Sequence, residues 1–318
     1  MNKPLITIGI TCFNAEDTIE RAVLSALHQD WPNKEILIVD DASSDGSIAV
    51  LNGLVNKYPE VQIIQHSNNC GYPCALNSII EKAHGEFIAI FDDDDVSIPS
   101  RLNEQYQRIQ DYEVKSGSSL IFCYSNRAVI KAGQNSPDHI AKALGRKACE
   151  PHGIAVVDYI FGFKSHPEFV WGLFGSCTLM ARRETFNRIG PFDETFRRCA
   201  EWDYAIRGGF QYAHFIAVDK ALITQYKTPS MDKSGAIPLQ YDLKIRVKYK
   251  SFLKAKKAYW ASRIISHARF TGSKGNILKS KLLVILACLT SPPMLINRIT
   301  KYLGLLNRNM LKNRNYRN

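Results

Sequence analysis

Four consecutive aspartates, Asp92–Asp95, follow directly after the apolar run "FIAIF" at residues 87–91. Adjacent carboxylates repel one another, and a pair ~4 Å apart near a protein surface costs on the order of 4 kcal/mol. A divalent cation removes this cost, and oxygen ligands suit Mg²⁺ or Mn²⁺ rather than Zn²⁺. The alternative is a solvated acidic turn or a cap for a helix beginning near Pro99, although one aspartate suffices for a cap. The cluster therefore predicts a Mn²⁺ or Mg²⁺ site.

A second pair of carboxylates ends the run "ILIVDDASSDGS". Asp40 and Asp41 could cap the helix expected from Ser47, but Ser43, Ser44 or Asp45 could do so without them. A carboxylate can also accept the imide N–H of uracil or the ring N–H of guanine. Together the two acidic groups indicate metal-dependent handling of a nucleoside diphosphate.

Alternating strand-like and helix-like segments position these groups. The segment pattern predicts an α/β fold with a mostly parallel sheet and helices on both faces. Ligands in such sheets bind beyond the carboxyl ends of the strands. Polar residues follow four successive expected strands, so we expect them to share one rim. The expected strands are 5–12, 35–39, 61–65 and 86–91, and the expected helices are 17–29, 47–57 and 75–83.

The remainder of the chain divides by composition. A helix over 101–112 and a strand over 120–124 precede a Gly-, Pro- and Lys-punctuated segment, 131–165, which indicates a long loop. A second compact block covers 170–228, and helices are expected over 240–267, 276–289 and 294–306. These patterns divide the chain into a body over 1–240, with halves 1–115 and 116–240, and a basic helical tail over 241–318.

The positive charge lies in that tail. Residues 243–318 contain 18 Lys and Arg and no Asp or Glu, which leaves 23 basic against 30 acidic residues in 1–242. Short apolar runs and an amphipathic pattern over 294–306 favour an anionic membrane surface as the partner, at ~1 kcal/mol per basic residue. Nucleic acid is disfavoured because the body is acidic and carries no recognition motif. The N-terminus is a poor signal peptide, so we expect a cytoplasmic protein, peripheral at the inner face of the cytoplasmic membrane.

The eight cysteines are scattered through the sequence. Only Cys70 and Cys74 are close together, and no CxxC pair occurs. This spacing gives no reason to expect a metal cage or a disulfide framework.

The order of motifs resembles the family 2 glycosyltransferases, whose fold is the glycosyltransferase A type. The resemblance rests on "ITIGITCFNAEDTIERAVLSALHQDWPNKEILIVDDASSDGS", on "NNCGYPCALN" and on "FDDDD", and it runs over residues 5–107 and more weakly over 170–228. It implies an inverting transfer of a sugar from a nucleotide sugar, a UDP-sugar in the first instance, to a glycan or lipid-linked acceptor. The family type suggests cell-surface polysaccharide synthesis, such as that of lipopolysaccharide or capsule.

The resemblance also implies roles for individual residues on the donor side. Asp41 matches the position that reads the uracil edge, Asp92 and Asp93 the positions that face the ribose, and Asp94 the metal ligand. Phe13 replaces the usual Tyr, and Leu76 stands where many members have Arg. The implied donor-binding residues are Thr11, Phe13, Asn14, Glu16, Asp41, Asn69, Gly71, Asn77, Asp92 and Asp93.

The resemblance implies a catalytic domain over 1–240, with a nucleotide-sugar and metal half over 1–115 and an acceptor half over 116–240. Within the acceptor half, the segment "CAEWDYAIRGGF" matches the family's catalytic motif. Inversion needs a carboxylate that takes the proton of the acceptor hydroxyl. Family members often read E-D-x-D followed three residues later by R. The same spacing counted back from Arg207 gives Glu201 as this base and Asp203 as the second candidate. Alternatively, both carboxylates pair with Arg207 in a salt-bridged helix start. The other positions implied near the acceptor are Trp202, Gly175 and Ser176.

Two other classes of function stay open. A nucleotidyltransferase would use the same rim aspartates, but it needs a phosphate-gripping loop near the first strand, and "CFNAED" provides none. A catalytically silent nucleotide-sugar-binding protein is the other class. Ala200 stands where a Glu often sits, and Glu201 stands where an Asp is usual. These two departures from the family pattern are the reason to consider a protein that binds the nucleotide sugar without turnover.

Overall fold

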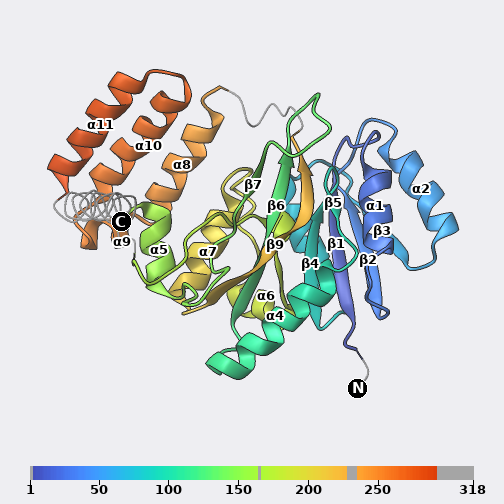
Figure 1. Ribbon diagram of the computed structural model, residues 1–318. Helices are drawn as coiled ribbons and strands as arrows, with labels where there is room; N and C mark the ends of the chain where they lie inside the picture. Colours follow the sequence, from blue (N-terminus) through green and yellow to red (C-terminus); the bar gives the residue numbers. More distant parts are fainter. Residues whose placement is uncertain (1–2, 164–165, 228–234, 292–318) are drawn as a thin grey trace, which may run out of the picture. The chain divides into compact units, whose positions relative to one another are not determined.

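The computed structural model describes residues 3–163, 166–227 and 235–291. The chain divides into two compact units, the first formed by 1–156 with 167–229 and the second by 157–166 with 230–318. Figure 1 shows a central sheet with flanking helices in the first unit and a group of helices in the second. All residues expected at the site belong to the first unit.

One sheet organises the first unit, in the order β3-β2-β1-β4-β8-β6-β9-β5, with β7 beside β6. The strands β3, β2, β1 and β4 are mutually parallel, as expected. Beyond them β8 is antiparallel to β4 and to β6, while β9 is parallel to β6. The α/β class is confirmed. The strands are β1 (Ile6–Cys12), β2 (Lys34–Asp40), β3 (Val61–Gln65), β4 (Phe87–Asp92), β5 (Val96–Ser97), β6 (Ile121–Ile130), β7 (His139–Ala141), β8 (Met180–Arg182) and β9 (His214–Tyr226).

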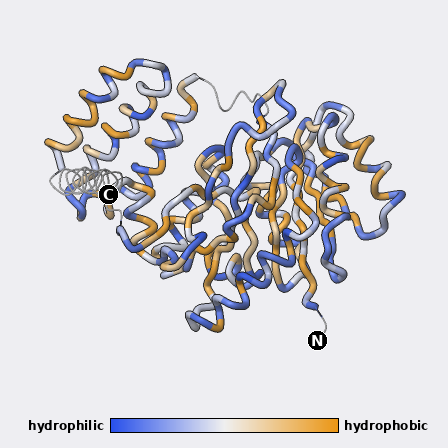
Figure 2. The backbone as a smooth tube through the Cα atoms, viewed as in Figure 1, coloured by the Kyte–Doolittle hydropathy of each residue, from blue (hydrophilic) through white to orange (hydrophobic). Residues whose placement is uncertain are grey.

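Helices cover both faces of this sheet. The side chains of Ile6, Ile8 and Ile10 in β1 belong to one buried cluster with apolar residues of α1, α2 and α4. On the opposite face a Cβ at Gly9 would lie 2.3 Å from Ile79 Cγ2, so the glycine lets α3 pack directly on β1. Figure 2 shows the hydrophobic residues concentrated in the strands. The helical segments of this unit are α1 (Ile19–Leu27), α2 (Ser47–Lys57), α3 (Tyr72–Lys82), α4 (Arg101–Ser116), η1 (Ser176–Thr178), α6 (Arg183–Ile189) and α7 (Ala200–Phe210).

The long loop expected over 131–165 is interrupted by β7 and by the helix α5 (Ile154–Phe161). One of its glycines allows close packing, since a Cβ at Gly145 would lie 2.0 Å from the main-chain oxygen of Phe215. The strand expected over 120–124 is also too short, because β6 pairs with β9 as far as Ile130.

Within the residues that the structure describes, the second unit contains four complete helices and most of α5. A single helix over 240–267 is wrong, because the chain turns after Lys248 and again at Lys257, which has φ +52°. The helix expected over 276–289 is confirmed as α11, and the one expected over 294–306 lies outside the described residues. The helices are α8 (Ile237–Lys248), α9 (Lys250–Ala255), α10 (Tyr259–Ser273) and α11 (Ile277–Thr290). Among the described helices, none has the length and apolarity needed to cross a membrane.

Candidate active site

The carboxyl ends of three parallel strands meet at one rim of the sheet. Cys12 of β1 is in register with Asp40 of β2, and Thr11 is in register with Asp92 of β4. The main-chain N–H of Asp41 donates to Cys12 O at 2.8 Å, which fixes the turn that leaves β2. The strand register therefore brings the two acidic motifs to the same rim, on the two strands that flank β1, as the strand order led us to expect.

The four aspartates after β4 form a partly buried acidic corner. Asp95 is buried, and its Oδ1 accepts a hydrogen bond from Tyr226 N of β9 at 3.1 Å. Asp93 Oδ2 accepts from Phe13 N at 3.0 Å. Burial, reinforced by neighbouring aspartates, raises the pKa of Asp92 and of Asp93 to about 7 and that of Asp95 to about 9. The corner is therefore short of positive charge.

These residues fit a hard divalent cation. Asp95 Oδ2 is buried and lacks a hydrogen-bond partner within the described part of the chain, and a buried carboxylate oxygen needs a donor or a metal. Ligand atoms of Asp92, Asp95 and Cys177 lie within 4.8 Å of one another. Asp94, the expected ligand, is partly exposed beside them. Its main-chain oxygen accepts from Arg21 Nη2 at 2.6 Å, which holds the turn in place. Asp92 and Asp95 are therefore placed to hold Mn²⁺ or Mg²⁺, and ligation by the neighbouring Asp94 stays a prediction.

Asp41 is buried and is already hydrogen bonded within the protein. Its Oδ1 accepts from Cys70 N at 3.0 Å and lies 2.8 Å from His66 Nδ1, while its Oδ2 accepts from Gly71 N at 2.7 Å. Asn69 Nδ2 donates to Asp41 O at 3.3 Å. Asp41 thus fixes the loop between β3 and α3 in this structure, and Gly71 enters α3 with φ +95°. Reading a nucleobase with Asp41 stays a prediction.

Two further donor-side residues hold the loop that leads into α2. Asn14 Oδ1 accepts from Ser44 N at 2.8 Å, and Glu16 Oε2 accepts from Gly46 N at 2.7 Å. Thr11 is buried in β1, whereas the Phe13 side chain is 46% exposed at the rim. Of these residues, Phe13 therefore presents the largest apolar surface to an incoming ring.

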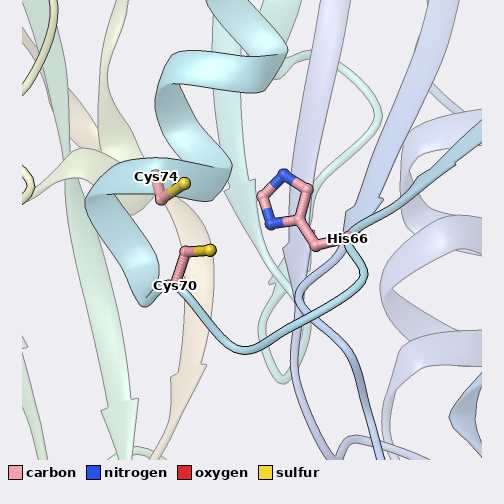
Figure 3. A group of neighbouring side chains, drawn as sticks. All are labelled: His66, Cys70 and Cys74. Atoms are coloured by element: carbon pink, nitrogen blue, oxygen red, sulfur yellow. The ribbon is translucent and has the colours of Figure 1, made fainter.

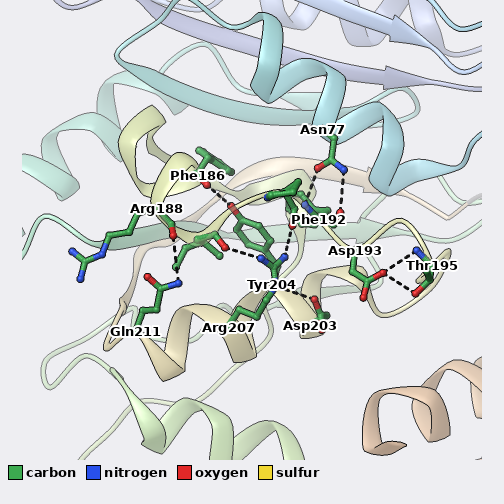
Figure 4. Close-up of polar contacts among 12 residues, drawn as sticks. Asn77, Phe186, Arg188, Phe192, Asp193, Thr195, Asp203, Tyr204, Arg207 and Gln211 are labelled. Atoms are coloured by element: carbon green, nitrogen blue, oxygen red, sulfur yellow. Dashed lines mark hydrogen bonds and ion pairs between the residues drawn. The ribbon is translucent and has the colours of Figure 1, made fainter. Parts of the chain in front are cut away.

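Asn77 braces α3 against the loop that precedes α7. It accepts from Phe192 N at 2.7 Å, and it donates to Phe192 O at 3.0 Å and to Glu194 at 2.9 Å. Figure 4 shows this bridge beside Tyr204 of α7. The structure thus gives Asn77 a structural contact, and donor binding by this residue stays a prediction.

The two candidate bases differ in their surroundings. Asp203 is fully buried and pairs with Arg207 Nε at 3.0 Å, and Arg207 also donates to Ile189 O and Pro191 O (Figure 4). Glu201 is partly exposed and accepts from Ser176 Oγ at 3.4 Å. The salt-bridged arrangement considered above therefore applies to Asp203, and Glu201 is the carboxylate accessible to an acceptor.

A short hydrogen-bonded chain joins the acidic corner to Glu201. Tyr72 donates its hydroxyl proton to Ser176 Oγ at 2.5 Å, and the same hydroxyl lies 3.2 Å from Asp92 Oδ1. Ser176 donates onward to Glu201. Burial and the charges of Asp92 and Glu201 raise the pKa of Tyr72, so the phenol stays protonated. The chain fixes the distance between the donor-side and acceptor-side carboxylates.

Gly175 and Trp202 complete the implied acceptor side. A Cβ at Gly175 would lie 2.7 Å from Arg127 Nη1, so the glycine lets this guanidinium approach the main chain just before η1. Trp202 lies in the first turn of α7 and is partly exposed next to Glu201. Nothing further in the structure distinguishes a stacking role for the indole.

Sequence reasoning missed Tyr72, Arg127 and Arg101. Arg101 is fully buried and donates to Ile90 O and Ser97 Oγ, and its charge acts on Asp92 and Asp95. The charge of Arg127 acts on the same aspartates. The run "CGYPC" reads as an ordinary helix start, and an arginine in a helix or strand pattern reads as a surface residue. Only the folded structure brings these side chains beneath the rim.

Comparisons with known proteins bear on the family and the fold. The model of a family described as glycosyl transferase family 2 matches residues 7–164. An uncharacterized glycosyltransferase of Haemophilus influenzae is 34% identical over 124 residues, covering 39% of this chain and 50% of that protein. The putative teichuronic acid biosynthesis glycosyltransferase TuaG of Bacillus subtilis is 33% identical over 105 residues, covering 33% of this chain and 42% of TuaG. The matched region spans about half the length of these curated relatives.

Among solved structures, S. aureus TarS 1–349 in complex with UDP-GlcNAc superposes with a TM-score of 0.60 at 18% identity. The superposition covers 89% of this chain and 79% of the TarS chain. At this identity the likeness shows the fold.

Proposed function

We propose that this chain, which belongs to glycosyl transferase family 2, transfers a sugar from a UDP-sugar to a hydroxyl of a glycan or lipid-linked acceptor. The observation that carries this proposal is the link from Asp92 through Tyr72 and Ser176 to Glu201, which sets a metal-binding corner beside an accessible base. The name of TuaG and the UDP-GlcNAc bound to TarS support a UDP-sugar donor and a surface polysaccharide product.

The reaction is an inverting displacement. Glu201 accepts the proton of the acceptor hydroxyl while the acceptor oxygen bonds to the anomeric carbon and the bond from that carbon to the diphosphate breaks. Mn²⁺ or Mg²⁺, when bound, neutralises the charge that develops on the leaving diphosphate. Asp92 and Asp94, with Asp95 beside them, would hold that cation, and Ser176 orients the Glu201 carboxylate. Phe13 and Asp41 bind the uracil ring, with Thr11, Asn14, Glu16, Asn69, Gly71, Asn77 and Asp93 lining the donor pocket.

The test is sugar transfer or slow hydrolysis by the full chain with Mn²⁺ and a panel of UDP-sugars, followed by UDP release. We expect Glu201→Gln to keep its UDP affinity and to lose turnover by about 10²–10⁴-fold, the usual contribution of a general base. Glu184→Gln, in an exposed position of α6, is the matched control. Asp203→Asn should lower stability through Arg207 and retain turnover.

Three results contradict the proposal. Normal transfer by Glu201→Gln with loss of transfer by Asp203→Asn would show that the base is Asp203. Release of pyrophosphate from a nucleoside triphosphate would favour a nucleotidyltransferase. UDP-sugar binding without turnover of any donor would favour a silent binding protein.

We further propose that residues 1–240 form the catalytic domain and that 241–318 attach it to the inner face of the cytoplasmic membrane. Helix α11 supports this proposal, because it exposes large apolar side chains while the tail carries no acidic residue beyond Asp242. Figure 2 shows hydrophobic positions along this helix. The exposed residues are Ile277, Leu278, Leu282, Ile285, Leu286 and Leu289.

Vesicle sedimentation tests the attachment. The full chain should sediment with vesicles that contain phosphatidylglycerol and remain in the supernatant with pure phosphatidylcholine, since anionic headgroups attract the basic residues. Leu282→Glu combined with Leu289→Glu should abolish sedimentation. Equal binding to both vesicle types, or binding that survives the double substitution, would contradict this proposal.

A further inference from the structure

Three side chains outside the acidic corner bring metal-binding atoms together where β3 leads into α3. His66 follows β3, Cys70 precedes α3, and Cys74 lies in the first turn of that helix. One ligand atom from each residue lies within 4.8 Å of the other two. Figure 3 shows both thiols on the side of the imidazole ring. The cysteine spacing considered above did not include His66, which lies four residues before Cys70 in the loop between β3 and α3.

The separations suit a tetrahedral cation after a small adjustment. Zinc lies about 2.3 Å from thiolate sulfur and about 2.0–2.1 Å from imidazole nitrogen, so its ligand atoms are about 3.5–3.8 Å apart. The group therefore needs to contract by roughly 1 Å at most. Cys70 is exposed and the other two side chains are partly exposed, so rotation of side chains suffices.

The neighbours of His66 suit a metal-bound imidazole. Its Nε2 lies 2.8 Å from Ser78 Oγ, and its Nδ1 lies 2.8 Å from Asp41 Oδ1. A cation on Nδ1 leaves Nε2–H to donate to Ser78, which is the usual outer contact of a metal-binding histidine. Asp41 Oδ1, which contacts Nδ1 in this structure, then lies next to the cation.

The charges around Cys74 favour a cation. Glu194 and Asp41 act electrostatically on its thiol, and a divalent cation is attracted by the same carboxylates and stabilises thiolates directly.

We propose that His66, Cys70 and Cys74 form a second metal site, specific for a thiophilic divalent cation such as Zn²⁺, with water as the fourth ligand. Each thiol releases its proton to solvent as its sulfur bonds to the metal, so one Zn²⁺ displaces two protons and no group is oxidised or reduced. The protein ligands, two sulfurs and one nitrogen, separate this site from the acidic corner, whose carboxylates suit Mn²⁺ or Mg²⁺.

Asp41 couples this site to the donor pocket, a step that rests on the proposed function. A cation on His66 Nδ1 attracts the Asp41 carboxylate beside it, which then becomes a weaker acceptor for the uracil N–H. Zn²⁺ and UDP should therefore weaken each other's binding by the same factor.

Cobalt is the probe for the site itself, since tetrahedral Co²⁺ bound to thiolates gives a near-ultraviolet charge-transfer band and strong visible bands. The full chain, reduced with a non-thiol reductant and stripped with a chelator, is titrated with Co²⁺. We expect both bands at one equivalent, and their loss on addition of one equivalent of Zn²⁺. A band that survives both Cys70→Ser and Cys74→Ser would instead come from Cys177 beside the acidic corner.

Cys70→Ser and Cys74→Ser should each abolish the charge-transfer band of the full site and weaken Co²⁺ binding by about tenfold or more. Cys70 is exposed, so its substitution does not endanger folding. Cys149→Ser, which removes an exposed cysteine outside the group, is the matched control and should keep the band. Absence of the band in the reduced wild type, or an unchanged band in Cys70→Ser, would overturn the site.

The coupling is measured separately, as UDP affinity at fixed Mn²⁺ with and without one equivalent of Zn²⁺. We expect Zn²⁺ to lower the affinity in the wild type and to leave it unchanged in Cys70→Ser. If cobalt binds and Zn²⁺ does not change UDP affinity, the coupling through Asp41 is refuted and the metal site stands. If UDP does not bind at all, the proposed function fails independently of the cobalt result.

Discussion

Substitution of Tyr72 by Phe tests whether the chain from Asp92 to Glu201 positions the site. The change removes one hydroxyl that contacts Ser176 at 2.5 Å and Asp92 at 3.2 Å, and it keeps the ring. A hydrogen bond to a charged group contributes about 1.5–3 kcal/mol, so the free energy of unfolding should fall by about that amount. For a unit of this size the corresponding fall in melting temperature is about 3–12 °C.

The kinetic effect should be specific. Without Tyr72 the Ser176 hydroxyl loses its partner, so the Glu201 carboxylate is held less firmly, and we expect kcat to fall while UDP affinity in Mn²⁺ changes by less than about threefold. The control is Tyr106→Phe, which removes a hydroxyl from a ring that packs on Trp31 and Phe87. A purely structural role would lower the melting temperature and leave kcat intact. Unchanged melting and unchanged kcat would refute the reasoning altogether.

Two stability predictions concern the rest of the first unit. Gly9→Ala should lower the free energy of unfolding by about 1–3 kcal/mol in urea titrations, because its Cβ would meet Ile79 at 2.3 Å. The control is Gly53→Ala, whose Cβ meets no atom within 4 Å and which should not destabilise the protein. Equal effects of the two substitutions would contradict this packing. Burial and the neighbouring His152 lower the pKa of His214, so the unfolded chain takes up a proton near pH 6.5 that the folded chain does not. Relative to a His214→Gln variant, in which the acidic corner is unchanged, the wild type should therefore lose stability as the pH drops below about 6.5, and parallel melting curves of the two proteins from pH 5 to 8 would contradict this assignment.

The sequence was sufficient for the first four parallel strands and the helices between them. Their apolar runs are bounded by turn residues, and the helix over 47–57 and the strand over 61–65 were placed without error. It was not sufficient for β7 and α5. There, glycines that usually mark loops instead allow close approach, as at Gly145, and a short apolar helix has too few turns to show a period.

The same limit applies to the site. The rim residues could be assigned because carboxylates at strand ends have a direct chemical meaning. Tyr72 could not be assigned, because its partners come from other elements of the fold. The group of His66, Cys70 and Cys74 could not be assigned either, because its members are close in the sequence but do not follow a familiar metal-binding spacing. Asp41 shows a third limit, since its hydrogen bonds to the loop at Cys70 and Gly71 give one residue a structural contact as well as an expected functional role.

The most direct test of a cation held at the acidic corner is calorimetric titration of UDP into the full chain with and without Mn²⁺, for the wild type and Asp94→Ala. The matched control is Asp17→Ala, which removes an exposed aspartate outside the corner. We expect Mn²⁺ to strengthen UDP binding in the wild type and the control, and to have no effect in Asp94→Ala. The same Mn²⁺-dependent affinity in Asp94→Ala as in the wild type would contradict the assignment.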